Sequence, residues 1–314
     1  MISSLRYTRQ GAIELYETEL SQPGPGEVQL RGLVCGVCSW DIATCKLGSS
    51  MAKPAPPGHE GVGIVEAVGP DVTGIRPGET YAVGGFQTYS NQPANKLHGR
   101  RIPSTSQLPP EQWIVEPVSC CVTGIDTARL QAGDRVALIG CGFMGQILLQ
   151  MLTRLALADL VALDLSPSRL ALASEAGVPE TINIQTSGPD LAGALSPRKF
   201  DVVFDTTGAQ PGLDLATAIV RQGGQINLFG WLKGTEATFD PTAWHTKGIT
   251  IVNASPSAKI RDPFPPAIRL IEREIVRLAP LVSDVVSLQE YPALMQRATA
   301  GDPNYLKGVV RLTE

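Results

Sequence analysis

A glycine-rich turn between an apolar strand and a helix is the feature that most constrains the fold of this chain. Residues 135–139 (RVALI) form a strand-like run, and the motif GCGFMG at 140–145 leads into an apolar segment that is helical to about residue 155. The motif fits Gly-x-Gly-x-x-Gly, whose glycines permit a tight turn, close approach of a pyrophosphate and close helix–strand packing. The amino terminus of the following helix stabilises phosphate charge. This context predicts a dinucleotide-binding strand–turn–helix unit.

The region after residue 121 continues with alternating strands and helices. The predicted strands are 135–139, 160–163, 201–205, 225–229 and 249–252, with further helices at 167–176 and 213–219. This alternation is typical of an α/β protein with a doubly wound parallel sheet. Beyond it, the tail contains one amphipathic helix at 267–278 and a last strand at 308–312, which we expect to rejoin the first part of the chain.

Asp164 ends the second predicted strand, 19 residues after Gly145. A carboxylate at this place accepts hydrogen bonds from the ribose hydroxyls of NAD and repels the 2′-phosphate of NADP, so NAD is favoured over NADP. Capping of the helix at 167–176 is an alternative role for Asp164, and Arg169 would soften the preference if it faced the ribose. The candidate cofactor-binding residues are Gly140, Gly142, Phe143, Met144, Gly145, Asp164 and Arg169.

The first part of the chain differs in composition and in the length of its predicted strands. From about residue 26 to 119 it is rich in glycine and proline and contains short β-like runs at 28–35, 61–69 and 79–85. Such runs with frequent turn signals predict a compact, partly open β-barrel or sandwich. The stretch PAPPG at 54–58 predicts a stiff loop that positions the residues after it.

Cys38 and the pair His59-Glu60 are a second chemical signal. Thiolate, neutral imidazole and carboxylate are the ligand types that zinc uses, and catalytic zinc sites combine three protein groups with one open position. The chain has only three histidines, and this one follows the proline-stiffened loop. Cys35 and Cys38 also fit the motif Cys-x-x-Cys. An alternative interpretation is that they form a redox pair or half of a structural zinc site.

The composition restricts the partners and the compartment. A net charge of −4 does not favour binding to the negatively charged backbone of nucleic acid. The most apolar stretch, 147–165, is interrupted by polar and charged residues, and the first twenty residues lack a signal-peptide core, so neither membrane insertion nor secretion is expected. Six cysteines in such a chain indicate free thiols or metal ligands, which favours the cytoplasm.

Five segments carry a resemblance to a known superfamily, namely GVCSWDI (36–42), GHEGVGIVEAVG (58–69), EPVSC (116–120), AGDRVALIGCGFMG (132–145) and KGVVRL (307–312). They resemble the medium-chain, zinc-containing alcohol and polyol dehydrogenases, including the sorbitol-dehydrogenase-like branch. The resemblance implies a GroES-like, β-rich catalytic domain at 1–121 and a Rossmann domain at 122–257. It further implies that a segment at 258–314 returns to the catalytic domain, and that the active site lies in the cleft between the domains.

The same resemblance assigns roles near the metal. Cys38 and His59 match the first two zinc ligands of the family, and Glu60 matches a neighbouring Glu that coordinates directly or through water. Glu116 matches the carboxylate ligand of the sorbitol-dehydrogenase-like branch, with Cys120 and Cys121 as alternative sulfur ligands. Asp41 matches the residue that would orient His59.

Two departures from the family pattern matter. Members with a structural zinc carry four closely spaced cysteines, whereas residues 81–110 contain none, so one catalytic zinc and no structural zinc are expected. Trp40 also stands where the family usually has a threonine or serine that passes the substrate's proton away. Ser39, or a water held by Glu60, would have to replace that hydroxyl. The candidate substrate-pocket residues are Trp40, Phe86 and Trp231.

The implied activity is hydride transfer between NAD(H) and an alcohol or carbonyl compound, such as a polyol, a sugar or an alcohol of secondary metabolism. The family also implies a homodimer or homotetramer, with the strand near 249–253 as a common dimer edge. Two alternatives remain at this point: a zinc-free quinone or enoyl reductase of the same superfamily, and a non-catalytic dinucleotide-binding sensor.

Overall fold

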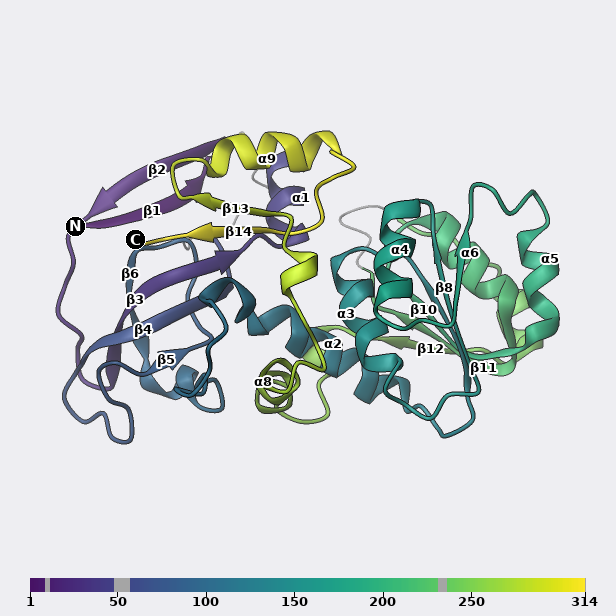
Figure 1. Cartoon of the computed structure of the whole chain (residues 1–314), viewed down its shortest axis with the longest axis horizontal. Coiled ribbons are helices and arrows are strands. Elements are labelled where there is room, and N and C mark those ends of the chain that lie inside the picture. Colours follow the sequence, from purple (N-terminus) through teal and green to yellow (C-terminus); the bar gives the residue numbers. More distant parts are fainter. Residues whose placement is uncertain (9–11, 48–56, 231–235, 314) are drawn as a thin grey trace. The chain divides into compact units, whose positions relative to one another are not determined.

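A computed structural model describes residues 1–8, 12–47, 57–230 and 236–313 (Figure 1). The chain divides into two compact units. The first comprises Met1–Pro117 and Phe264–Glu314, and the second comprises Val118–Pro263. Among the described residues, no helix has both the length and the apolar character required to span a bilayer.

The first unit contains a mixed sheet and a hairpin. The sheet has the strand order β13-β14-β3-β4-β5, with β6 also paired to β3, and β1 pairs with β2. The strands are β1 (Ile2–Tyr7), β2 (Ile13–Thr18), β3 (Glu27–Gly36), β4 (Glu60–Val68), β5 (Thr80–Tyr81), β6 (Tyr89–Pro93), β13 (Asp284–Ser287) and β14 (Gly308–Arg311). The helices are α1 (Ser39–Leu47), η1 (Ala94–Leu97), η2 (Pro110–Gln112), α8 (Phe264–Glu272), η5 (Ala279–Leu281) and α9 (Tyr291–Ala300), and α2 (Val115–Ala128) begins there.

Strand β3 organises this unit. It pairs antiparallel with β4 on one side and with β14 on the other, so the last strand of the chain lies beside the segment that precedes Cys38. Its residues Val28 and Leu30 belong to one buried cluster, and Cys35 belongs to a second that also contains Phe86 and Tyr291. The strand therefore connects both cores of the unit to the end of the chain.

The second unit is a six-stranded sheet with the order β12-β11-β10-β7-β8-β9, in which every neighbouring pair is parallel. This confirms the predicted doubly wound parallel sheet. The strands are β7 (Arg135–Ile139), β8 (Asp159–Asp164), β9 (Glu180–Asn183), β10 (Phe200–Asp205), β11 (Val220–Leu228) and β12 (Thr250–Asn253). The helices are α3 (Phe143–Leu152), α4 (Pro167–Glu175), α5 (Leu191–Leu195), η3 (Ser196–Arg198), α6 (Gln210–Ile219), α7 (Pro241–Lys247) and η4 (Pro256–Ala258).

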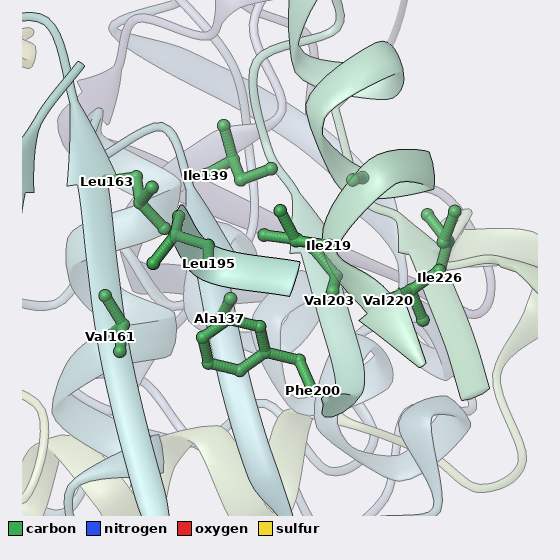
Figure 2. Packing of buried hydrophobic residues seen from close by; sticks show 11 residues of the cluster. Ala137, Ile139, Val161, Leu163, Leu195, Phe200, Val203, Ile219, Val220 and Ile226 are labelled. Carbon is green, nitrogen blue, oxygen red and sulfur yellow. The ribbon is translucent and has the colours of Figure 1, made fainter. Parts of the chain in front are cut away.

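An apolar cluster on this sheet fixes the positions of its strands (Figure 2). Leu163 of β8 and Val203 of β10 are fully buried, and Leu195 of α5 and Ile219 of α6 belong to the same cluster. Burying a side chain of this size stabilises the fold by about 1.5–3 kcal/mol. The cluster therefore holds in place the strand ends that carry the glycine-rich turn and Asp164.

The amphipathic helix predicted at 267–278 is shorter than expected. Helix α8 ends at Glu272 because Glu274 adopts a left-handed conformation with φ of 51°. The amides of Ile275 and Val276 then turn back to the carbonyl of Leu270, which closes the helix end. The prediction of a helix to residue 278 was wrong because glutamate, unlike glycine, gives no local signal of such a turn.

Candidate metal centre and dinucleotide loop

Three predicted metal ligands come together at one end of the β3–β4 pair. Cys38 follows β3, and His59 and Glu60 stand at the start of β4. Their potential ligand atoms all lie within 4.8 Å of one another. The antiparallel register pairs Gly36 with Glu60, which explains why segments twenty residues apart in sequence supply one cluster.

Glu116 lies at the edge of this cluster. It belongs to the first turn of α2, and its Oε2 atom is 4.0 Å from Nε2 of His59. The side chains of His59 and Glu116 are 43% and 22% exposed, so solvent reaches this side of the cluster. A thiol, an imidazole and two carboxylates at this separation are a donor set that fits zinc.

Cys121, an alternative sulfur ligand in the sequence, is occupied elsewhere. Its thiol is fully buried in the second unit and donates to the carbonyl of Met144 at 3.6 Å.

The thiol of Cys38 is protonated when no metal is bound. Burial raises its pKa to about 12, and the negative charge of Glu60 adds to the rise, while Lys307 opposes it. Because the thiolate is the form that ligates a metal, binding at this cluster must displace the proton.

Lys307 is a residue of this site that the sequence analysis did not identify. Its Nζ atom forms an ion pair with Oε2 of Glu60 and donates to the carbonyl of Val37 at 2.9 Å. Burial alone would lower the pKa of Lys307, but the charge of Glu60 raises it, so the ammonium form is held. A Cβ atom at Gly36 would overlap the Glu60 carboxylate, so only glycine leaves room for the pair. The only signal in the sequence was the lysine that opens KGVVRL.

Asp41 is fully buried beside Cys38. Its Oδ2 atom accepts a hydrogen bond from the Cys38 amide at 2.8 Å, and its Oδ1 atom accepts one from the Tyr7 hydroxyl at 3.4 Å. Burial raises its pKa to about 6, and the Cys38 amide and His59 oppose the rise. Asp41 was expected to orient His59, but its hydrogen bonds go to Cys38 and Tyr7, so it supports the Cys38 side of the cluster.

The residues expected around the substrate lie in different places. Ser39 is exposed and Trp40 is half-buried, both in the first turn of α1. Phe86 is fully buried, and its ring centroid is 4.9 Å from that of Tyr291. Phe86 is therefore a core residue and not a pocket wall, because the apolar cluster takes up its whole surface. Trp231 and residues 54–56 of the proline-rich loop lie outside the described residues.

The glycine-rich turn of the second unit leaves open space at Gly142, directly before the helix that follows it. Gly140 has a φ of 97°, and a Cβ at Gly145 would overlap the Gly140 carbonyl, so both positions require glycine. A Cβ at Gly142 would meet nothing within 4 Å. Helix α3 begins at Phe143 without a side-chain cap, and the amino terminus of a helix is a favourable place for a phosphate. Phe143 is buried and Met144 half-buried in that first turn.

Asp164 lies against the glycine-rich turn. It is 6% exposed, and its two carboxylate oxygens accept hydrogen bonds from the amides of Cys141 at 2.6 Å and Ser166 at 2.7 Å. It is not the N-cap of α4, because Ser166 occupies that position. The side chain of Gln146, which the sequence analysis missed, ties the turn to α4 by donating to the carbonyls of Cys141 and Arg169 at 3.1 and 2.7 Å.

Comparison with known proteins identifies both parts of the chain. Residues 24–102 match the family model of the alcohol dehydrogenase GroES-like domain, and residues 144–273 match that of the zinc-binding dehydrogenases. Sorbitol dehydrogenase from Homo sapiens is 26% identical over 318 residues, which cover 89% of this chain and 88% of that protein.

Solved structures share the fold. 2R,3R-butanediol dehydrogenase from Bacillus subtilis superposes with a TM-score of 0.86 at 22% identity and 99% coverage of both chains. A protein described as a zinc-binding dehydrogenase from Sinorhizobium meliloti 1021, bound to NADP, gives 0.85 at 22% identity and the same coverage. The predicted combination of a GroES-like domain and a Rossmann sheet is confirmed. The chain thus belongs to the superfamily of zinc-containing alcohol and polyol dehydrogenases, which are oxidoreductases that use a nicotinamide cofactor.

Proposed function

We propose that this protein transfers a hydride reversibly between an alcohol, most suitably a polyol or a related diol, and NAD. The observation that carries the proposal is the convergence of Cys38, His59 and Glu60 within 4.8 Å in a chain that also contains an open glycine-rich turn. We assign catalysis to the first unit and cofactor binding to the second. The relatives that act on sorbitol and on butanediol support a substrate with more than one hydroxyl group.

Cys38, His59 and Glu116 would hold one zinc ion, with Glu60 as a direct or water-mediated ligand. When bound, zinc supplies Lewis-acid polarisation of the substrate oxygen, which lowers the pKa of the alcohol. The protein would keep Glu60 ionised through Lys307 and would fix the Cys38 backbone through Asp41. No cysteine lies between residues 81 and 110, so we propose that the chain binds one zinc and no structural zinc.

The proton of the alcohol needs a route to solvent. Trp40 has no oxygen to relay it, and Oε2 of Glu60 is buried and ion-paired with Lys307. We therefore assign the relay to Ser39, which is exposed in the first turn of α1. Its hydroxyl would accept the substrate's proton while it releases its own to water. The indole of Trp40 would instead shape the substrate pocket.

We propose NAD as the cofactor that is preferred. The amides of Cys141 and Ser166 hold the carboxylate of Asp164 beside the glycine-rich turn, where it would accept hydrogen bonds from the ribose hydroxyls and repel a 2′-phosphate. Arg169 is half-buried on α4, and a guanidinium directed at the ribose would reduce this preference. The Sinorhizobium meliloti relative was crystallised with NADP. The preference between NAD and NADP must therefore be measured for this protein.

We further propose that the protein forms a homodimer or homotetramer and acts in the cytoplasm. Strand β12 is one of the two edge strands of the parallel sheet, and none of the described strands pairs with its outer side, where a second copy could add. The cysteines are free thiols, a state that reducing compartments maintain. Sedimentation analysis of the purified protein tests the assembly directly.

A panel of polyols, diols and simple alcohols tests the proposed function. Zinc-loaded protein is assayed with NAD and, in parallel, with NADP, and its metal content is measured. We expect one zinc per chain and turnover of at least one polyol or diol with NAD. A metal-free protein that reduces quinones or enoyl compounds, or one that binds NADH and turns over no alcohol, would contradict the proposal.

A further inference from the structure

Two tyrosines lie next to Asp41, of which Tyr291 is fully buried and Tyr7 is half-buried. The hydroxyl oxygens of Tyr7, at the end of β1, and Tyr291, at the start of α9, are 2.6 Å apart. Tyr7 also donates to Oδ1 of Asp41 in α1 at 3.4 Å. A chain of hydrogen bonds thus links β1, α9 and α1, three elements from distant parts of the sequence that Figure 1 shows in the first unit.

The hydrogen bonds of this group run in one direction. An ionised carboxylate only accepts, so the Tyr7 proton points to Asp41, and the Tyr7 oxygen is left to accept the proton of Tyr291. Burial raises the pKa of both phenols well above the ordinary value, so both remain neutral donors. The Tyr7 proton is therefore directed to the carboxylate of Asp41, and the Tyr291 proton to the oxygen of Tyr7.

The second oxygen of Asp41 connects the group to a metal ligand. Oδ2 accepts the backbone amide of Cys38 at 2.8 Å, and Asp41 is fully buried, so its orientation depends on these few partners. A buried carboxylate without its hydrogen bonds is strongly destabilised and reorients or takes up a proton. The position of the Cys38 backbone is thereby coupled to the Tyr7 hydroxyl.

Packing alone does not explain the hydroxyl of Tyr291. The side chain is fully buried in an apolar cluster that includes Phe86 and Leu294, where phenylalanine would fill the same space. A buried hydroxyl is unfavourable unless it is hydrogen-bonded, and the hydroxyl of Tyr291 is hydrogen-bonded to that of Tyr7. The hydroxyl of Tyr291 is therefore explained by its hydrogen bond to Tyr7, which in turn donates to the carboxylate of Asp41.

We propose that Tyr7 and Tyr291 are positioning residues of the zinc site. Through Asp41 they hold the Cys38 backbone, and with it the thiolate, in the geometry that the metal requires. Partners beyond the ligands of a metal typically change its affinity 10–100-fold when they are removed. The inference rests on the proposed function, because it presupposes that Cys38 ligates zinc.

The test compares three tyrosine-to-phenylalanine variants. Tyr7→Phe and Tyr291→Phe remove the two hydroxyls, and Tyr81→Phe is the matched control, because Tyr81 is buried in the same unit and donates to Glu79 at 2.9 Å. Zinc affinity is measured by competition with a chromogenic chelator, and thermal unfolding is followed for the metal-free and zinc-loaded forms. We expect zinc binding to weaken about tenfold in Tyr7→Phe and less in Tyr291→Phe. Tyr81→Phe should bind zinc like the parent protein.

A double-mutant cycle shows whether Tyr7 acts through Asp41. In an Asp41→Ala background, Tyr7→Phe should change zinc affinity no further, because the side-chain oxygen that accepts the Tyr7 hydroxyl is gone. Equal destabilisation of metal-free and zinc-loaded Tyr7→Phe, with unchanged zinc affinity, would show a merely structural role and overturn the inference. Additive effects with Asp41→Ala would overturn it too. If the parent protein itself bound no zinc, the proposed function would fail instead.

Discussion

Lys307 and Glu60 form an ion pair in which the two side chains are only 4% and 2% exposed. The pair stands directly behind Cys38 and His59, so its charges act on the metal cluster at short range. With a divalent cation bound as proposed, that cation and the ammonium of Lys307 would balance a Cys38 thiolate and the carboxylates of Glu60 and Glu116. The ion pair with Glu60 explains why a lysine is tolerated in the core of this unit.

Lys307→Met should destabilise the protein by about 3–5 kcal/mol, because it leaves the Glu60 carboxylate buried without its partner. Urea unfolding of the metal-free protein measures the change. Lys96→Met, at an exposed position in η1, is the control and should change stability by less than about 0.5 kcal/mol. Similar stabilities for the two variants would show that the ion pair contributes little.

Cys38→Ser should remove the bound zinc and lower kcat/KM by at least about 100-fold, since it deletes a ligand and not merely a supporting group. Metal analysis and alcohol oxidation are measured on the same sample. Cys120→Ser, which removes a cysteine that the sequence left open as an alternative ligand, should retain zinc. If Cys120→Ser lost its zinc and Cys38→Ser kept it, the sulfur ligand would be Cys120 and not Cys38.

Ser39→Ala should lower kcat about 100-fold while zinc content is unchanged, because general acid–base relays contribute on this scale. Trp40→Thr, made in the Ser39→Ala background, restores a hydroxyl at the position where the family usually has one. We expect it to recover part of the lost kcat. Full activity in Ser39→Ala would show that the proton leaves by another route.

Asp164→Ala should raise the KM for NAD about tenfold and lower the preference for NAD over NADP, because the carboxylate that separates the two cofactors is removed. Initial rates with both cofactors give the ratio of the kcat/KM values. Glu175→Gln removes a charge from an exposed position on α4 and serves as the control. An unchanged ratio in Asp164→Ala would exclude this residue from cofactor selection.

Asp201 should make stability depend on acid pH. Burial opposes its ionisation, but hydrogen bonds from the Arg135 amide and the Arg221 guanidinium outweigh it and lower its pKa below the ordinary 3.8. The carboxylate therefore stabilises the fold above about pH 3.8, and this contribution is lost as the pH falls through the lower folded value. Asp201→Asn should be less stable than the parent near pH 6, and the difference should shrink below pH 3.8 in unfolding curves. A difference independent of pH would contradict this assignment.

Much of the site could be predicted because its signals are local in the sequence. The glycine-rich turn, the strand before it and Asp164 lie within thirty residues, and their spacing alone indicates nucleotide binding. Cys38 and His59 were recognisable by residue type and context. The end of α8 could not be predicted in this way. Glu274 adopts a left-handed conformation there, and glutamate gives no signal of it in the sequence.

The sequence by itself indicated the alternation of strands and helices around the glycine-rich turn, that turn itself and the residues proposed as metal ligands, since each depends on neighbouring residues or on a short motif. Only the tertiary structure decided what surrounds those ligands. Lys307 reaches Glu60 because β14 pairs with β3. Tyr7 of β1 reaches Asp41 of α1, and Tyr291 reaches Tyr7 from α9, which packs against α1. Buried charges and hydroxyls take their partners from whatever the sheet register and helix packing bring within hydrogen-bond distance, and no local pattern encodes that choice.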